Sequence, residues 1–265
     1  MYRQLAQFSL VTLLFGWQPS SADAQQTSAH HLGFFKYYPS SNGIVIAAPH
    51  GRYDKNTDGI AIAISRILKS GYVIARGFSI GKPRINVNRP TESYPRSNGS
   101  EFLTSRSAKA YSQYVGILRE LGGGNHLKLY VEIHGHSSRL ANTIEIASVG
   151  LSADRAFDVK RIFTCVLRET KMMHRGYPNV DLKIEPADFL SYRAIKSKQI
   201  GSLSANIADL ALHVELPLVL RQDQSIEATA QLIAFLITSN AMKGVDPIDS
   251  PSLQWNYSRC DSFRS

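Results

Sequence analysis

LYVEIHGHS, residues 129–137, is an apolar stretch that ends in polar side chains. Two further stretches have the same character, GIVIAAPHG at 43–51 and LALHVELPL at 210–218. Short apolar runs of this kind are typical of buried strands. Polar residues at the carboxyl ends of such strands lie where open α/β sheets bind their ligands. The three stretches therefore predict one sheet with a functional site at one of its edges.

The segments between these stretches indicate a single α/β domain with a central mixed, mostly parallel sheet flanked by helices. Further strands are predicted where short apolar runs lie between turn residues, and helices where apolar residues recur at helical spacing. A long polar loop is expected at 77–99. The predicted strands are 43–48, 72–75, 127–134, 143–147, 180–184 and 210–215, and the predicted helices are 57–70, 100–121, 152–174 and 225–237.

Residues 1–24 are predicted to be a secretory signal peptide. MYRQ is a short basic start, residues 5–17 are apolar, and Ala-Asp-Ala at 22–24 has the form of a cleavage site. The apolar part is too short for an ordinary membrane span, and an uncleaved anchor is the alternative. The domain is therefore expected at 25–265, periplasmic or secreted, with no stable membrane span after cleavage.

Export allows a disulfide between the two cysteines, Cys165 and Cys260. Cys165 also fits the apolar stripe of the predicted helix 152–174, so a buried free thiol is an equal alternative.

The formal net charge of +9 favours anionic partners. The basic residues are scattered, and the sequence has no nucleic-acid motif with interleaved aromatics. A small acidic or peptide substrate is expected, and nucleic acid is not.

Strand alternation places Glu132, His134 and His136 on one face of the stretch 129–137. Three residues of metal-ligand type within five positions are a stronger signal than one histidine. His134 is the predicted ligand, and Glu132 is either a ligand or a carboxylate that orients an imidazole. The alternative is a polar strand end whose groups are satisfied by hydrogen bonds.

His50 follows the strand 43–48, and Asp54 lies four residues further on. A tight loop would bring this imidazole and this carboxylate to one metal ion. Asp58 is a second candidate carboxylate, although it also suits a helix cap. Two imidazoles and a carboxylate are donors that suit zinc, so His50 and His134 are expected to share one ion. The alternative for His50 is a surface histidine beside a turn aspartate.

Alternation also turns His213 and Glu215 to one side of the stretch 210–218. A carboxylate in so apolar a strand is costly to bury unless it is paired or binds a metal. Burial is expected to raise the pKa of Glu215, which suits a general base or acid near neutral pH. A structural salt bridge to a nearby arginine is the alternative.

Arginines and asparagines cluster between residues 76 and 89. The planar guanidinium of arginine binds carboxylates through two hydrogen bonds, and it can also stabilise an oxyanion. The cluster therefore indicates a substrate-binding loop, with a solvated basic loop as the alternative. Its members are Arg76, Arg84, Asn86, Asn88 and Arg89.

With these segments in order, the chain from about 43 to 220 resembles the N-formylglutamate amidohydrolase family and, more distantly, the carboxypeptidase A-like zinc peptidases. APHGRYDKNTDGIA is similar to the segment with the first ligand, and ARGFSIGKPRINVNRP to the substrate loop. VEIHGHS is similar to the strand with the third ligand, and HVELP to the strand with the catalytic glutamate. The first ligand segment has the spacing H-x-x-x-D, where zinc peptidases have H-x-x-E.

The resemblance implies a zinc carboxypeptidase-like fold and a zinc-dependent hydrolase of an amide bond. It implies that His50, Asp54 and His134 bind Zn²⁺ and that Glu215 is the general base. It also implies that Arg84 or Arg89 holds a substrate carboxylate or the oxyanion, and Asn88-Arg89 is similar to the Asn-Arg pair of carboxypeptidases. The remaining expected site residues are therefore Arg84 in catalysis and, in substrate binding, Arg76, Asn88, Arg89 and His136. Two alternatives remain, a metal-dependent amidohydrolase barrel suggested by the H-x-H at 134–136 and an exported, non-catalytic binding protein for acidic ligands.

Overall fold

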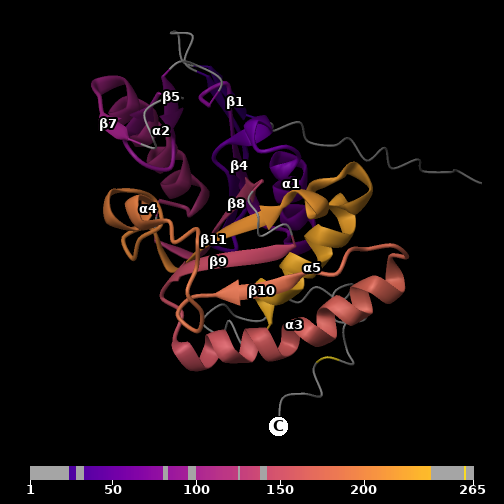
Figure 1. Cartoon of the computed structure of the whole chain (residues 1–265). Helices are drawn as coiled ribbons and strands as arrows, with labels where there is room; N and C mark the ends of the chain where they lie inside the picture. The colour runs from indigo at the N-terminus through magenta and orange to yellow at the C-terminus, as the bar shows by residue number, and fades with distance from the viewer. Residues whose placement is uncertain are drawn as a thin grey trace, which may run out of the picture.

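The computed structural model describes residues 24–27, 33–79, 83–94, 100–124, 126–137, 142–239 and 260. They form an α/β domain with a large mixed sheet and a small second sheet (Figure 1). The fold class predicted from the sequence is confirmed. The expected signal peptide, apart from its last residue, lies outside the described residues. Within the described part of the chain, no helix is long and apolar enough to cross a membrane.

The main sheet has eight strands among the described residues, in the order β1-β2-β4-β3-β8-β11-β9-β10. Four of its neighbouring pairs are parallel, β3–β4, β3–β8, β8–β11 and β9–β10, and the other pairs are antiparallel. The central strands β3, β8 and β11 therefore run in one direction, and their carboxyl ends meet at one edge. The strands are β1 (Ala24–Thr27), β2 (Phe34–Tyr38), β3 (Ile44–Ala48), β4 (Gly71–Arg76), β8 (Leu127–His136), β9 (Thr143–Val149), β10 (Asp181–Ile184) and β11 (Ala208–Pro217).

Helices cover both faces of this sheet. On one face α1, α3 and α5 share a single apolar core with the strands, and on the other face α2 shares a second core with them. The α-helices are α1 (Thr57–Leu68), α2 (Ser105–Leu121), α3 (Ala153–Met173), α4 (Ile195–Ile200) and α5 (Ile226–Thr238). Short 3-10 helices are η1 (Gly51–Tyr53), η2 (Leu218–Arg221) and η3 (Asp223–Ser225).

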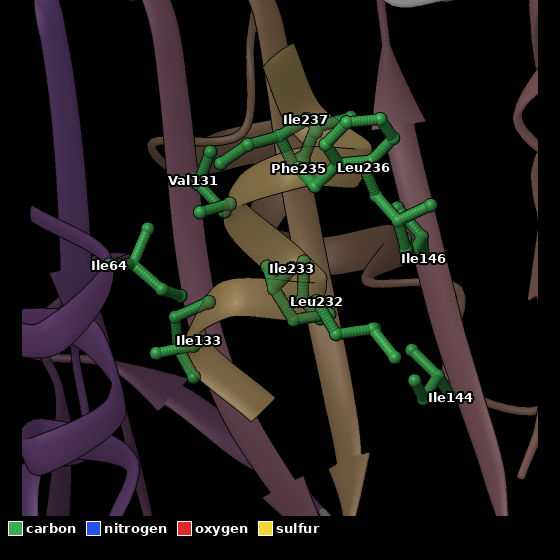
Figure 2. Packing of buried hydrophobic residues seen from close by; sticks show 14 of the residues in the cluster. Ile64, Val131, Ile133, Ile144, Ile146, Leu232, Ile233, Phe235, Leu236 and Ile237 are labelled. Atoms are coloured by element: carbon green, nitrogen blue, oxygen red, sulfur yellow. The ribbon is translucent and has the colours of Figure 1, made fainter. Parts of the chain in front are cut away.

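The core between α5 and the sheet holds the central strands in place. Figure 2 shows the apolar side chains of α5 packed against those of β8 and β9. Val131, Ile133, Leu232 and Ile233 are fully buried there. Each such side chain contributes roughly 1.5–3 kcal/mol relative to an exposed position. The strand ends that carry polar residues are thus attached to a rigid layer.

The sequence prediction was wrong for the segment that precedes α2. A loop was expected at 77–99 and a helix from residue 100, but a small antiparallel sheet forms there. Its strands are β5 (Arg84–Asn86), β6 (Thr91–Ser93) and β7 (Glu101–Leu103). Thr104 caps α2, and its hydroxyl oxygen accepts from the backbone N–H of Ser107. Phe102 of β7 is 49% exposed.

A disulfide joins Cys165 of α3 to Cys260, which excludes the free-thiol alternative. The bond closes a loop with a sequence separation of 95 residues. Because such a cross-link restricts the unfolded chain, replacing both cysteines by serine is expected to lower the free energy of unfolding by about 2–4 kcal/mol. Urea unfolding measures this loss of stability. The unmodified protein in reductant should lose a similar amount of unfolding free energy. Equal stability with and without reductant would contradict this expectation.

Candidate active site

Polar side chains from three neighbouring strands gather at the carboxyl edge of the main sheet. His50 follows the end of β3, and in the register of β8 and β11, His134 lies beside Glu215. Apolar residues precede each of them and anchor the strands in the core. This is the edge at which open α/β sheets bind ligands. The three polar strand ends singled out in the sequence are thus brought together.

His50, Asp54 and His134 form a group that could hold a metal ion. Their potential ligand atoms all lie within 4.8 Å of one another. Asp54 Oδ2 is 2.9 Å from His50 Nδ1 and 3.7 Å from His134 Nδ1. The single turn of η1 brings the carboxylate back toward His50, since η1 fills the three positions between them.

The donors of this group fit a zinc ion. Two imidazoles and one carboxylate, all nitrogen and oxygen ligands, are a common protein set for catalytic zinc. His50 Nε2 is buried and has no hydrogen-bond partner among the described residues, so this atom is unsatisfied in the protein alone. Buried polar atoms normally have a partner, and an ion is one way to supply it.

The charges of this group are strongly coupled. Burial lowers the pKa of His134, but hydrogen bonds with Asp54 and Glu132 and the charges of nearby carboxylates raise it to about 10. Burial raises the pKa of Asp54, but hydrogen bonds and the charges of His134 and His50 hold it far below its usual range. Without a metal, a proton on His134 therefore offsets the negative charge of the carboxylates. A divalent cation would supply the same compensation.

Asp58, the second candidate carboxylate, lies elsewhere. Its Oδ2 accepts from Arg76 Nη2 at 2.9 Å, and its Oδ1 accepts from the backbone N–H of Gly59. Asp58 thus lies in the first turn of α1 as a paired carboxylate, and Asp54 is the aspartate beside the two histidines. The same ion pair holds the guanidinium of Arg76 beside Asp58.

Glu215 is buried, and its carboxylate is 3.1 Å from His213 Nε2. The sequence predicted a raised pKa for Glu215, and this was wrong. Burial alone would raise the pKa, but the hydrogen bond with His213 and the positive charges of His213 and His134 lower it below its usual value. Glu215 is therefore ionised near neutral pH and can accept a proton.

A cavity of about 350 Å³ opens onto these residues. His50, His134, His213 and Glu215 line its floor. Residues 191–197, which we call the 191–197 segment, supply much of its wall, together with Arg89 and Glu101. A cavity of this size can take a small molecule or the end of a peptide.

Cations lie on the wall of this cavity. Arg89 binds Glu101 through two hydrogen bonds of 2.9 and 2.7 Å, and Lys196 Nζ lies 3.6 Å from the same carboxylate. Burial raises the pKa of Glu101, but Arg89 and its other neighbours lower it to about 2. Arg193, half exposed, lies 3.8 Å from Glu185. Arg193 and Lys196 were not singled out in the sequence, because only the folded 191–197 segment brings them here.

Arg84, predicted in catalysis, and the other residues predicted in substrate binding occupy different positions. The guanidinium of Arg84 lies over the ring of Tyr53 at 4.3 Å, and neither Arg84 nor Arg76 lines the cavity. Asn88 is fully buried, and its amide donates to Glu132. His136 is buried, with Nε2 2.9 Å from the carbonyl oxygen of Thr143 and its ring stacked on Tyr192. Of the predicted arginines, Arg89 is therefore the one at the cavity.

Two buried charged residues outside the sequence prediction support the site. Glu145 of β9 accepts from the backbone N–H groups of Ser191 and Tyr192 at 3.2 and 2.7 Å, which fixes the start of the 191–197 segment. Arg221 donates to the carbonyl oxygens of Leu216, Lys55 and His136 at 2.9–3.2 Å. Arg221 thus ties together the ends of β8 and β11 and the loop after Asp54.

Gly135→Ala is expected to destabilise the protein by about 1–3 kcal/mol. A Cβ at Gly135 would overlap the guanidinium of Arg221, which three carbonyl oxygens hold in place. Gly116→Ala in α2 is the control, because a Cβ there meets nothing within 4 Å. This control should gain about 0.5–1 kcal/mol, since glycine is unfavourable inside a helix. Urea unfolding compares the two, and a Gly135→Ala variant as stable as the unmodified protein would contradict the packing argument.

No protein-family model matches the sequence, and no curated protein matches it. Several solved structures have a fold similar to that of this chain, at low sequence identity. A bacteriophage poly-gamma-glutamate hydrolase is 10% identical with a TM-score of 0.47, and the match covers 80% of this chain and 90% of that chain. N-formylglutamate amidohydrolase from Ralstonia eutropha is 14% identical with a TM-score of 0.43, covering 78% and 97%. The CwlD amidase from Clostridioides difficile, solved with the GerS lipoprotein, is 19% identical with a TM-score of 0.33, covering 76% and 96%.

The first family that the sequence resembles is thus among the structural neighbours. At these identities the function of this chain rests on the geometry of its own site.

Proposed function

We propose that this chain is a zinc-dependent hydrolase that cleaves an amide bond in a substrate with a carboxylate. One observation supports the proposal above all. Three groups of metal-ligand type, on His50, Asp54 and His134, converge at a cavity whose floor includes His50, His134 and the ionised carboxylate of Glu215.

The roles follow from the positions of the side chains. When bound by His50, Asp54 and His134, zinc supplies a Lewis acid that polarises the scissile carbonyl and makes water more acidic. Glu215 accepts the proton of the attacking water and returns it to the leaving amine. Its pKa, held below the usual value, keeps it ionised for the first of these transfers.

The charge of the cavity wall supports a substrate with a carboxylate. Arg89, Arg193 and Lys196 all line the cavity, and arginine binds carboxylates through paired hydrogen bonds. We assign Arg89 to the substrate carboxylate because it is the arginine of the predicted substrate loop that reaches the cavity. N-acyl amino acids, peptides and cell-wall peptides share this chemistry. The roles predicted for Arg76, Arg84, Asn88 and His136 remain predictions.

We also propose that the protein is exported to the periplasm or beyond the cell. The Cys165–Cys260 disulfide supports this location, because disulfides persist in oxidising compartments.

Metal analysis together with a substrate panel tests the proposed function. We expect one zinc ion per chain and hydrolysis of N-acyl amino acids or short peptides that stops when a chelator removes the metal. Restored zinc should restore turnover. Each substrate should be cleaved faster than its counterpart with an amidated carboxylate, because the amide offers no negative charge to the cations of the cavity wall. If the purified protein contains no zinc and its activity is unchanged by the chelator, the proposal is wrong. Calorimetric binding of an acidic ligand without any product would favour the non-catalytic alternative.

A further inference from the structure

Glu132 of β8 is a fully buried carboxylate in the middle of the site. Its Oε1 accepts from the hydroxyl of Tyr130 at 2.9 Å and from that of Ser202 at 2.5 Å. The hydroxyl of Tyr130 also contacts that of Tyr114 at 2.6 Å, so the chain of hydrogen bonds continues into the α2 core. One oxygen of Glu132 is thus anchored to rigid parts of the fold.

The other oxygen of Glu132 faces the two imidazoles of the cavity floor. Oε2 accepts from Asn88 Nδ2 at 3.0 Å and lies 3.1 Å from His134 Nε2 and 3.0 Å from His213 Nδ1. The two rings stack with centroids 4.0 Å apart. A single carboxylate therefore fixes the orientation of both rings.

His213 connects this carboxylate to Glu215. Its Nδ1 faces Glu132, and its Nε2 lies 3.1 Å from Glu215 Oε1. With a carboxylate at each ring nitrogen, the ring cannot turn without losing a hydrogen bond. The orientation of Glu215 is thereby tied to the buried anchor on β8.

We propose that Glu132 is a positioning residue, whose buried carboxylate orients His134 directly and orients Glu215 through His213. The inference deepens the proposed function and rests on it, since His134 and Glu215 are there the ligand and the base. The role is distinct from metal binding, because Glu132 acts on the rings by hydrogen bonds. Partners of this kind behind a metal ligand typically change metal affinity or activity by about 10–100-fold when they are replaced.

Glu132, His134 and His213 also lie close enough together to hold an ion themselves, and the structure argues against that use. Five donors already surround the two oxygens of Glu132, whereas a carboxylate has about four lone-pair sites. All three residues are buried, and an ion between them would replace the contacts of both rings with Glu132. A second zinc site here is the alternative that the experiment must exclude.

Glu132→Gln is the first variant, because the amide keeps the size of the side chain but turns a donor toward one of the rings. We expect zinc affinity, measured by competition with a chelator, and kcat at saturating zinc each to fall by about 10–100-fold. KM should change by less than about threefold, since Glu132 does not line the cavity. Glu169→Gln is the control, a buried glutamate of α3 whose partner is Arg168. It should leave zinc affinity and kcat unchanged.

Two substitutions of His213 separate its two contacts. Glutamine places its amide near the Nε2 position of histidine, and asparagine places it near the Nδ1 position. His213→Gln can still donate to Glu215 but loses the contact with Glu132, whereas His213→Asn loses the contact with Glu215. Because either change breaks the connection between Glu132 and Glu215, we expect kcat to fall by about tenfold or more in both variants. Both variants should still bind one zinc ion. A kcat like that of the unmodified protein in either variant would refute the link through His213.

Imidazole NMR of the metal-free protein tests the positioning without any turnover. Ring N–H protons that donate to Glu132 should be protected from exchange with water in the unmodified protein. This protection should be lost in Glu132→Gln. The inference would be overturned if the ring protons of the unmodified protein were unprotected, or if their protection were the same in Glu132→Gln. A second zinc equivalent that disappears in both Glu132→Gln and His213→Asn would overturn it as well, since Glu132 would then be a ligand. If the unmodified protein neither binds zinc nor hydrolyses amides, the proposed function fails, and the ring protons still decide the role of Glu132.

Discussion

Glu215→Gln is expected to lower kcat by about 10²–10⁴-fold while one zinc ion stays bound. The amide is the same size as the carboxylate but cannot accept a proton, so the attacking water loses its base. His213 Nε2 can still donate to the amide oxygen, which keeps the local geometry. Because the metal group consists of His50, Asp54 and His134, the metal content should not change.

Steady-state kinetics and metal analysis on the same preparation measure both halves of this prediction. Glu169→Gln again serves as the control for removing a buried carboxylate outside the site. A Glu215→Gln variant with unchanged kcat would take Glu215 out of the mechanism. Loss of zinc together with activity would instead make Glu215 a ligand.

His134→Asn is expected to abolish both zinc binding and turnover. His134 contacts Asp54 on one side and Glu132 on the other, and the shorter asparagine cannot bridge them. Zinc at about 1,000 times its dissociation constant stabilises a folded protein by about 4 kcal/mol. We therefore expect added zinc to raise the melting temperature of the unmodified protein and to leave that of His134→Asn unchanged.

His136→Gln is the matched control for zinc binding. It removes an imidazole two positions further along β8 that contacts Thr143 and Tyr192 and does not belong to the metal group. This variant should bind one zinc ion and show the full thermal shift. If His134→Asn also kept the shift, the metal group would have to be reassigned.

The main sheet and much of its helical cover could be predicted because strong local patterns specify them. The strand at 43–48 is an unbroken apolar run, and the strand at 210–215 is apolar apart from His213 and Glu215. The helices α3 and α5 have apolar residues at helical spacing. The small sheet of β5, β6 and β7 was missed because strands of three residues are too short to show an alternation. The strands β5 and β6 also contact α2, and no local sequence pattern contains these contacts.

The site was predictable where one strand or one tight turn carries it. Alternation along β11 correctly placed His213 beside Glu215, and the spacing of His50 and Asp54 suited the turn that joins them. The shared contact of Glu132 with His213 was not predictable, because it depends on the register between β8 and β11. The pKa of Glu215 was mispredicted for the same reason, since burial was visible in the sequence and the partner charges were not.

The floor and the wall of the cavity come from different parts of the chain. The floor is built by strand ends locked in the core, whereas the 191–197 segment is one continuous piece of the connection between β10 and β11. Glu145 binds the start of this piece through the backbone N–H groups of Ser191 and Tyr192, so these two hydrogen bonds do not depend on which side chains the segment carries. Randomising the side chains of the 191–197 segment should therefore give variants with new substrate selectivity, while the residues of the cavity floor stay the same.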